Sequence, residues 1–363
     1  MPGVVHARDI IAAVERLAPP SLAEGWDNGG LQVGYGEAEV NRVLVALTPL
    51  PEVFDEAEET GADFLLFHHP LIFAPLKSVE TSSYPGDLVA RAVAKNLTVY
   101  AAHTSYDAAP DGVSVALAGA IGLRGAREVV SPRGALRKLV VFVPVENVEA
   151  VAEALSGAGT GVIGDYTRVT FRSPGTGTFL PGEGSDPYLG EKGRLERVAE
   201  IRLETVVPAH LARAAVEAAT AAHPYEEVAL DVYPVEGSPE DCGYGRVGDL
   251  SEPLTAEGLR RQASDALGFP ARLVANPNPE REVGRVAALG GSGGSFIAEV
   301  AASGAGAYVT GDLDYHDALL AESLGLAAID AGHAATELPS LEPLAERLTR
   351  SVGVPVEVSR VRR

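Results

Sequence analysis

Short apolar runs alternate with helix-like segments near the start of the chain, and this alternation constrains the fold most strongly. Runs rich in apolar and β-branched residues occupy 43–47 and 63–67, and residues 52–60 between them have a helical pattern. A further apolar run at 97–102 follows a helix-like stretch at 86–95. Strands that alternate with helices at this spacing predict βαβ units and a largely parallel sheet. The fold class is therefore α/β.

The same alternation resumes near the C-terminus, from residue 288 onward. We expect strands at 307–310 and 327–329, and helices at 295–303, 316–324 and about 336–350. The two ends of the chain therefore predict one kind of α/β architecture.

The middle of the chain differs and contains a partial internal repeat. Each copy has a strand, a proline and an alanine-rich helix, in "VFVPVENVEAVAEAL" and "ETVVPAHLARAAVEAA". Such doubling predicts a ferredoxin-like α+β module, which we place at 136–237. It would split an outer α/β domain into halves at 1–135 and 238–363.

Composition narrows the classes of partner and of metal site. Of 363 residues, 46% are hydrophobic and 22% charged, which predicts a folded globular protein. The net charge of −21 argues against nucleic acid as the main partner, although an acidic surface alone also explains it. A single cysteine excludes a thiolate-rich metal site. Without a signal peptide or a membrane-spanning apolar run, we expect a cytoplasmic protein with no membrane partner.

Residues of metal-binding type follow the predicted strands. His68 and His69 come directly after "DFLLF", at the end of a strand, where open α/β sheets place their ligands. Asp107 lies just beyond the next apolar run, although a turn or a helix cap would also explain it. His333 and Glu337 are four residues apart at the start of a predicted helix and share one face, as a surface ion pair also would.

Three imidazoles and two carboxylates are suitable ligands for two divalent ions, either zinc, manganese or iron. Two such ions activate water, so hydrolysis is the reaction class that the residues favour. Hydrolysis also needs a group that accepts or donates protons, and we expect it at the end of another strand. Candidates are His103, Asp312 and His316, with capping or structural roles as the alternatives.

Two glycine-rich turns are candidates for substrate binding. Trp26 and Asn28 belong to "GWDNGG", and Gly291 and Ser292 belong to "GGSGGS", whose amides are suited to an anion. An ordinary structured turn and close helix–strand packing explain the glycines about as well. In the middle module, "HPYEE" contains His223, for which a structural role is favoured.

Several of these motifs together resemble the Nif-three-like dinuclear metal centre family, whose members are often named GTP cyclohydrolase type 2 homologues. The resemblance covers nearly the whole chain and rests on "WDNGGLQVG", "FHHPLIF", "AHTSYD", "GGSGGSF", "TGDLDYHDA" and "IDAGHAATE". It implies the five ligands of two metals that are given above, and a homohexamer. It also implies that 136–237 is a PII-like or CutA-like insertion. Ser105 and Tyr106 depart from the Asn–Leu that the family more usually has there.

Two functions follow as expectations. The first is a dinuclear-metal-dependent hydrolase that acts on a nucleotide-like small molecule, in the manner of a GTP cyclohydrolase type 2 homologue. The alternative is a non-catalytic metal-binding regulatory or scaffold protein whose middle domain senses a ligand.

Overall fold

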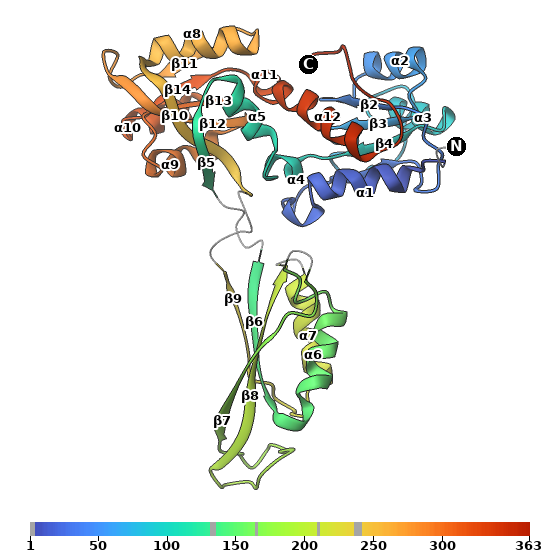
Figure 1. The fold of residues 1–363 in the computed structure, drawn as a ribbon, viewed down its shortest axis with the longest axis vertical. Helices are drawn as coiled ribbons and strands as arrows, with labels where there is room; N and C mark the ends of the chain where they lie inside the picture. The colour runs from blue at the N-terminus through green and yellow to red at the C-terminus, as the bar shows by residue number, and fades with distance from the viewer. Residues whose placement is uncertain (1–3, 131–135, 164–165, 209–210, 236–241) are drawn as a thin grey trace. The chain divides into compact units, whose positions relative to one another are not determined.

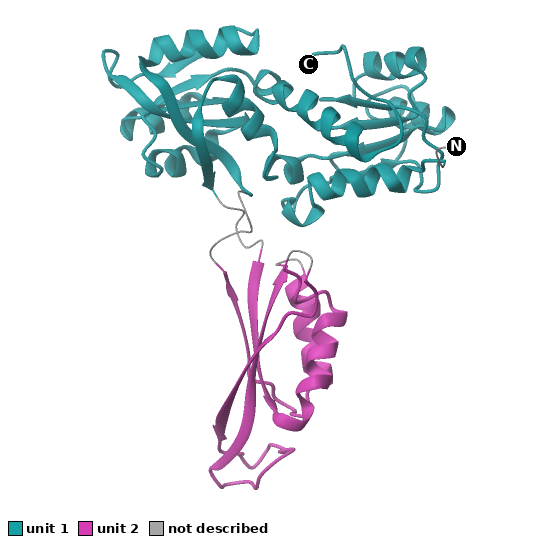
Figure 2. Cartoon of the chain, in the orientation of Figure 1, with its two compact units in different colours: residues 1–132, 239–363 teal, residues 133–238 magenta. Residues whose placement is uncertain are grey.

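The computed structural model describes residues 4–130, 136–163, 166–208, 211–235 and 242–363. The chain forms two compact units (Figure 2), one of Met1–Pro132 with Pro239–Arg363 and one of Arg133–Ser238. Among the described helices, none combines the length and the apolar character that crossing a bilayer requires.

In the described residues, unit 1 contains two sheets (Figure 1). The first of them has five strands. Its strands, in order across the sheet, are β1 (Gly30–Val33), β4 (Thr98–Ala101), β3 (Phe64–Phe67), β2 (Val43–Ala46) and β15 (Val356–Val358). All neighbours are parallel except β1 and β4. The predicted strands at 43–47, 63–67 and 97–102 are thus confirmed to within a residue or two.

Helices cover both faces of this sheet, and its three central strands are therefore buried throughout. One face packs against α1 (Ala7–Leu17) and α12 (Leu341–Ser351). The opposite face packs against α2 (Pro51–Thr60) and α3 (Gly86–Ala94). Strands that are buried on both faces have continuous apolar sequences, which is why these strands could be predicted from the sequence.

The second sheet of unit 1 has six strands, and only its centre is parallel. In order they are β11 (Arg272–Ala275), β14 (Ala327–Asp330), β13 (Ala307–Gly311), β12 (Glu282–Ser292), β10 (Tyr244–Thr255) and β5 (Arg124–Val130). Parallel pairing joins β12, β13 and β14, whereas the other neighbours are antiparallel. The expectation of a largely parallel sheet therefore fails here, because strands at both edges add antiparallel pairs.

This second sheet is also covered on both faces. Helices α5 (Val113–Ala120) and α8 (Ala256–Leu267) pack on one side. Helices α9 (Ile297–Ala302) and α10 (Tyr315–Ser323) contribute to the core on the other side.

Strands from the two ends of the chain are exchanged between the sheets. The C-terminal β15 pairs with β2 in the first sheet, whereas β5, which precedes the middle unit, pairs with β10 in the second. The two sheets consequently do not coincide with the two outer segments of the sequence.

The predicted helix at 336–350 is broken in the structure. A short helix α11 (His333–Glu337) is followed by a 3₁₀ turn (Leu338–Ser340) before α12 begins. Pro339 lies in that turn and cannot supply a backbone donor to a continuing helix. The break makes Glu337 the last residue of a separate short helix.

Unit 2 has the element order βαββαβ. It consists of β6 (Leu136–Pro144), α6 (Val148–Gly157), β7 (Phe171–Phe179), β8 (Glu196–Pro208), α7 (Ala212–Ala222) and β9 (Leu230–Pro234). The strands form one antiparallel sheet in the order β7-β8-β6-β9, with α6 and α7 packed together on one face. This is the order of a ferredoxin-like module, and each copy of the repeat forms a strand, a proline and a helix.

Candidate metal centre

The histidine pair lies where β3 ends. The amides of His68 and His69 still donate to Ala46 and Leu47 of the neighbouring strand, at 3.1 and 2.9 Å. Adjacent residues in extended backbone direct their side chains differently, and here His68 is buried whereas His69 is half-buried. The pair therefore presents two imidazoles at one end of the parallel sheet.

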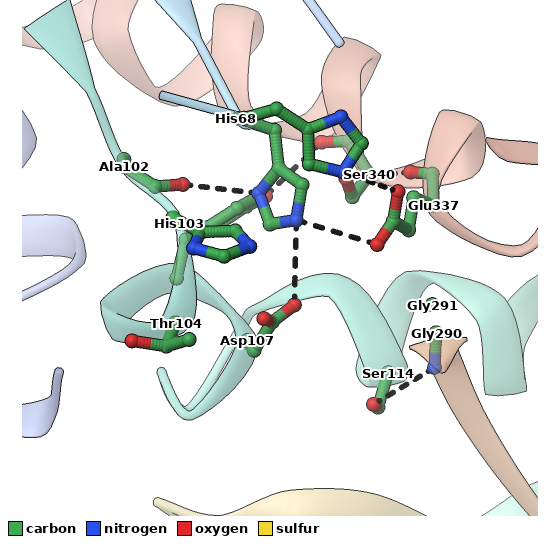
Figure 3. A network of polar contacts seen from close by, with 12 residues as sticks. His68, Ala102, His103, Thr104, Asp107, Ser114, Gly290, Gly291, Glu337 and Ser340 are labelled. Carbon is green, nitrogen blue, oxygen red and sulfur yellow. Dashed lines mark hydrogen bonds and ion pairs between the residues drawn. The ribbon is translucent and has the colours of Figure 1, made fainter. Parts of the chain in front are cut away.

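Three residues from other segments converge on this pair, and Figure 3 shows two of them, Asp107 and Glu337, beside His68. Asp107 ends the short helix α4 (Thr104–Asp107) after β4, and His333 and Glu337 begin and end α11. The Nε2 atom of His68 lies 3.6 Å from Oδ1 of Asp107 and 3.5 Å from Oε1 of Glu337. Glu337 is also 3.2 Å from Nε2 of His69 and 3.1 Å from Nε2 of His333. The structure thus brings together all five residues that the sequence proposed as ligands.

Each imidazole is held from outside the cluster through its Nδ1 atom. His68 Nδ1 donates to the carbonyl oxygen of Ala102 at 3.0 Å. His69 Nδ1 is 3.1 Å from the hydroxyl of Thr48, and His333 Nδ1 is 2.6 Å from the carboxylate of Asp312. Contacts of this kind fix the ring orientation of metal-binding histidines. Here they leave each Nε2 atom directed at Glu337.

Buried polar atoms in the cluster lack hydrogen-bond partners. They are Nε2 of His68, Oδ1 of Asp107 and Oε2 of Glu337. An unpartnered polar atom in a protein interior is costly, and a cation that binds all three would remove that cost. The cluster therefore fits a metal ion by its chemistry as well as by its arrangement.

The donor atoms divide into overlapping groups that could hold an ion. His68, Asp107 and Glu337 form one group, and His69, His333 and Glu337 form another. Glu337 belongs to both groups, so one carboxylate connects them. A further group joins His68 and His69 with His103.

Electrostatics within the cluster also favour a cation. Burial raises the pKa of Asp107 to about 6, and the neighbouring Glu337 carboxylate adds to this. Burial opposes protonation of His68, but Asp107 and Glu337 outweigh it and raise its pKa to about 9. The hydrogen bond to Glu337 likewise raises the pKa of His333 to about 9. The carboxylates thus attract positive charge, which a metal would supply.

A second layer of side chains surrounds His103. Nδ1 of His103 lies 2.8 Å from the carboxylate of Asp27, and its ring centroid is 5.3 Å from that of His68. The exposed rings of Trp26 and Phe73 have centroids 6.1 and 6.4 Å from that of His103. Of the residues proposed for the pocket, His103 and Trp26 therefore lie beside the cluster.

Asp27, Phe73 and Thr48 also contact the proposed residues, although the sequence motifs assign them no role. Asp27 is adjacent to Trp26 in the same turn, so that turn was the available signal. Phe73 follows the histidine pair in "FHHPLIF". Thr48 had no recognisable signal, because its role depends on the spatial approach of β2 and β3.

The remaining proposed residues are placed differently. The side-chain amide of Asn28 donates to the carbonyl oxygen of Ile72. The amide of Gly291 donates to the Thr336 hydroxyl at 2.9 Å, and so that N–H is already used within the protein. A Cβ at Gly291 would come within 2.5 Å of Glu337 Oε1, so this glycine makes room for the carboxylate.

Two more proposed residues lie on the surface. Ser292 is exposed at the end of β12. His316 is exposed in the first turn of α10, where its amide donates to Asp314 and its ring lies beside Tyr315. Substrate binding by Ser292 and proton transfer by His316 stay predictions.

The fold and this cluster define an α/β protein with a candidate histidine–carboxylate metal site. Residues 5–363 match the family described as Duf34/NIF3 (NGG1p interacting factor 3), and the chain belongs to that family. This confirms the resemblance seen in the sequence motifs.

Individual relatives are similar in sequence to this chain over most of their length. A protein of Halalkalibacterium halodurans named "GTP cyclohydrolase 1 type 2 homolog" is 42% identical over 91% of this chain and 89% of its own. A protein of the same name from Bacillus subtilis is 41% identical over 92% of this chain and 90% of its own. The crystal structure of a Bacillus cereus protein related to NIF3 is 39% identical, covers 99% of this chain and 98% of its own, and has a TM-score of 0.69.

Proposed function

We propose that this chain is a metal-dependent hydrolase that acts on a nucleotide-like small molecule. The observation that carries the proposal is the buried set of polar atoms on His68, Asp107 and Glu337 that have no hydrogen-bond partner. GTP is the first substrate to test, because relatives with about 40% identity bear the name GTP cyclohydrolase 1 type 2 homolog.

Two divalent ions, of zinc, manganese or iron, fit the donor groups. His68, Asp107 and Glu337 would hold one, and His69, His333 and Glu337 would hold the other. Nitrogen and oxygen ligands without thiolate are compatible with all three metals. Such ions supply Lewis acidity and make water a better nucleophile near neutral pH.

His103 is the residue best placed to move a proton. Burial opposes ionisation of Asp27, but hydrogen bonds from His103 and Thr104 lower the pKa of Asp27 to about 2. The ionised Asp27 accepts a hydrogen bond from Nδ1 of His103, which leaves Nε2 of that ring to accept a proton.

Trp26 and Phe73 would orient the substrate. Their ring centroids lie 6.2 Å apart, and both rings are exposed beside His103. Exposed aromatic rings stack on planar heterocycles, so these two would hold a base next to the metal ligands. Asp312 would act indirectly, by fixing the orientation of His333.

The test of this proposal is an activity assay on protein loaded separately with zinc, manganese and iron(II). With GTP as substrate, we expect release of formate from the opened five-membered ring. Asp107→Ala should abolish it, whereas the exposed Asp265→Ala in α8 should not. No turnover with any metal would refute the GTP version, as would full activity of Asp107→Ala.

The alternative function, a metal-binding regulatory or scaffold protein, makes a different prediction. Metal would bind in stoichiometric amounts and nucleotides would not turn over. Deleting the middle segment would then abolish the cellular role and leave the metal content unchanged.

We also propose the wider organisation that the family resemblance implies. Residues 1–135 and 238–363 would form the metal-binding domain, and 136–237 a PII-like or CutA-like insertion. Copies of the chain would assemble as a homohexamer. Sedimentation equilibrium tests this directly, since six times the chain mass of 37.6 kDa is expected and a monomer would contradict it.

A further inference from the structure

Unit 2 contains a cavity of about 640 Å³ on the face of its sheet opposite to α6 and α7. Leu139, Val141 and Leu203 pack against the helices, so their neighbours of opposite parity face away from them. Those neighbours include Phe142 and Arg202, which line the cavity. The remaining walls come mainly from residues of β7 and of the segments 179–189 and 225–229. Its volume is within the range of small-molecule sites.

Aromatic rings form one side of the cavity. The ring of Tyr225 lies near those of Phe179 and Tyr188, with centroid distances of 6.1 and 6.2 Å. The ring planes are tilted by 59° and 50°, so the rings do not stack flat on one another, and all three residues line the cavity. Aromatic faces carry partial negative charge, and cages of this kind bind organic cations.

A buried carboxylate lies against the same rings. Glu200 is buried, and its Oε1 atom accepts a hydrogen bond from the Tyr225 hydroxyl at 3.0 Å. Gly177 makes room for it, since a Cβ at that position would lie 2.1 Å from Oε2 of Glu200. Burial, followed by the interaction with Glu200, raises the pKa of Tyr225, so its hydroxyl remains a donor. The hydrogen bond therefore fixes a negative charge beside the cage.

The charge of the lining is negative overall. Glu226 and Glu227 join Glu200 in the wall, against the single cation of Arg202. Arg202 is already paired with Glu204 at 2.8 Å, and its guanidinium lies 6.0 Å from the centre of the Phe142 ring. Phosphate or another anion would meet repulsion here, whereas a cation would be attracted.

We propose that this cavity binds a small organic ammonium ion, held among Phe179, Tyr188 and Tyr225 and neutralised by Glu200. "HPYEE" thereby acquires two roles. His223 is structural, since its Nε2 donates to the carbonyl oxygen of Phe142 at 2.9 Å, and the residues after it bind the ligand. The proposal is independent of hydrolysis, because every residue that it uses belongs to unit 2.

Calorimetric titration of the full chain tests the proposal with two cations, choline and spermidine. The neutral analogue 3,3-dimethylbutan-1-ol has the shape of choline without its charge and serves as the control ligand. We expect saturable binding of at least one cation at one site per chain. The neutral analogue should bind at least about tenfold more weakly than choline where choline binds.

Three variants locate the site. Glu200→Gln removes the charge and Tyr188→Ala removes one wall, and each should weaken cation binding by about tenfold or more. Glu200 is buried, so Glu200→Gln could destabilise the fold. Tyr188 is half exposed, so Tyr188→Ala should leave the fold intact and tests the site even then. The matched control is Glu217→Gln, an exposed residue of α7 paired with Arg213, which should bind normally.

Other outcomes would overturn the proposal. One is that neither cation binds, or that Tyr188→Ala binds a cation as tightly as the unchanged chain does. Another is that guanosine, added as a third probe, binds whereas the cations do not, which would make the ligand a neutral base. The last is that Tyr188→Ala lowers the mass of the assembly while no cation binds, which would make this surface a contact between copies of the chain.

Discussion

Glu337 in unit 1 and Glu200 in unit 2 are both buried carboxylates, but their surroundings differ. Glu337 lies within 3.1–3.5 Å of three imidazole nitrogens, and its Oε2 atom has no hydrogen-bond partner. Glu200 accepts a hydrogen bond from Tyr225 and faces a cavity. The first arrangement is suited to an ion held inside the protein, whereas the second leaves room for an exchangeable ligand.

Glu56 is a third buried carboxylate, and both of its oxygens accept hydrogen bonds from the protein. It accepts from the hydroxyl of Ser359 at 2.6 Å and from both the amide and the side chain of Arg360. Such a carboxylate contributes to stability without any ligand. The three residues therefore differ in how far their oxygens are satisfied by the protein itself, which is why metal binding is proposed for Glu337, ligand binding for Glu200 and a structural role for Glu56.

The largest expected effect is on metal affinity when Glu337 is changed. Glu337→Gln removes the charge shared by both donor groups, so affinity should fall by more than the roughly tenfold to hundredfold typical of residues that only orient ligands. Competition with a chromophoric chelator measures it. Glu200→Gln is the matched control and should bind metal with unchanged affinity. An equal loss of metal affinity in both variants would contradict the assignment of the metal site to Glu337 alone.

Metal should also stabilise the fold through the same cluster. At a free metal concentration of 100 times Kd, linkage predicts an increase of about 2.7 kcal/mol in the free energy of unfolding for each ion bound. Urea unfolding with and without metal measures this increase. Glu337→Gln should show almost none of it, and an increase of the same size in the variant would contradict the assignment.

A smaller effect is expected for the residue that holds His333. Asp312→Asn keeps the size of the side chain but weakens the charged contact to Nδ1 of His333, so affinity should drop roughly tenfold to hundredfold. Asp265→Asn, on the exposed face of α8, provides the control for a lost surface charge. Unchanged affinity in Asp312→Asn would show that the contact does not support metal binding.

The smallest effect concerns Glu56 and depends on pH. Burial opposes its ionisation, but hydrogen bonds from Ser359 and Arg360 outweigh it and lower the pKa of Glu56 below 4.5. A lowered pKa in the folded state contributes stability above the unfolded pKa and loses it as pH falls through the folded value. Glu56→Gln should therefore cost about 1 kcal/mol at pH 7 and less at pH 3 in urea unfolding. A cost that does not change with pH would contradict this.

Much of the first sheet was predictable because β2, β3 and β4 are continuous apolar runs. The ligands were predictable for a related reason, since His68, His69 and Asp107 follow those strands closely. By contrast, β5 has an exposed, arginine-containing sequence, and β15 has only three residues. Their exchange between the sheets depends on tertiary pairing, which no local pattern records.

The break before α12 was partly visible in the sequence, because Pro339 disfavours a continuous helix. The sharing of Glu337 between two donor groups was not visible, since it depends on distances between segments. The same holds for Asp27 and Asp312, whose partners His103 and His333 lie 76 and 21 residues away. Spacing can suggest ligands, but only the folded chain shows what orients them.

The central claim is that the buried cluster is a metal centre, and anomalous X-ray scattering from crystals grown with manganese or zinc tests it most directly. We predict one anomalous peak within bonding distance of His68, Asp107 and Glu337, and a second within bonding distance of His69, His333 and Glu337. Absence of a peak at these five residues, in crystals of protein that binds the metal in solution, would contradict it.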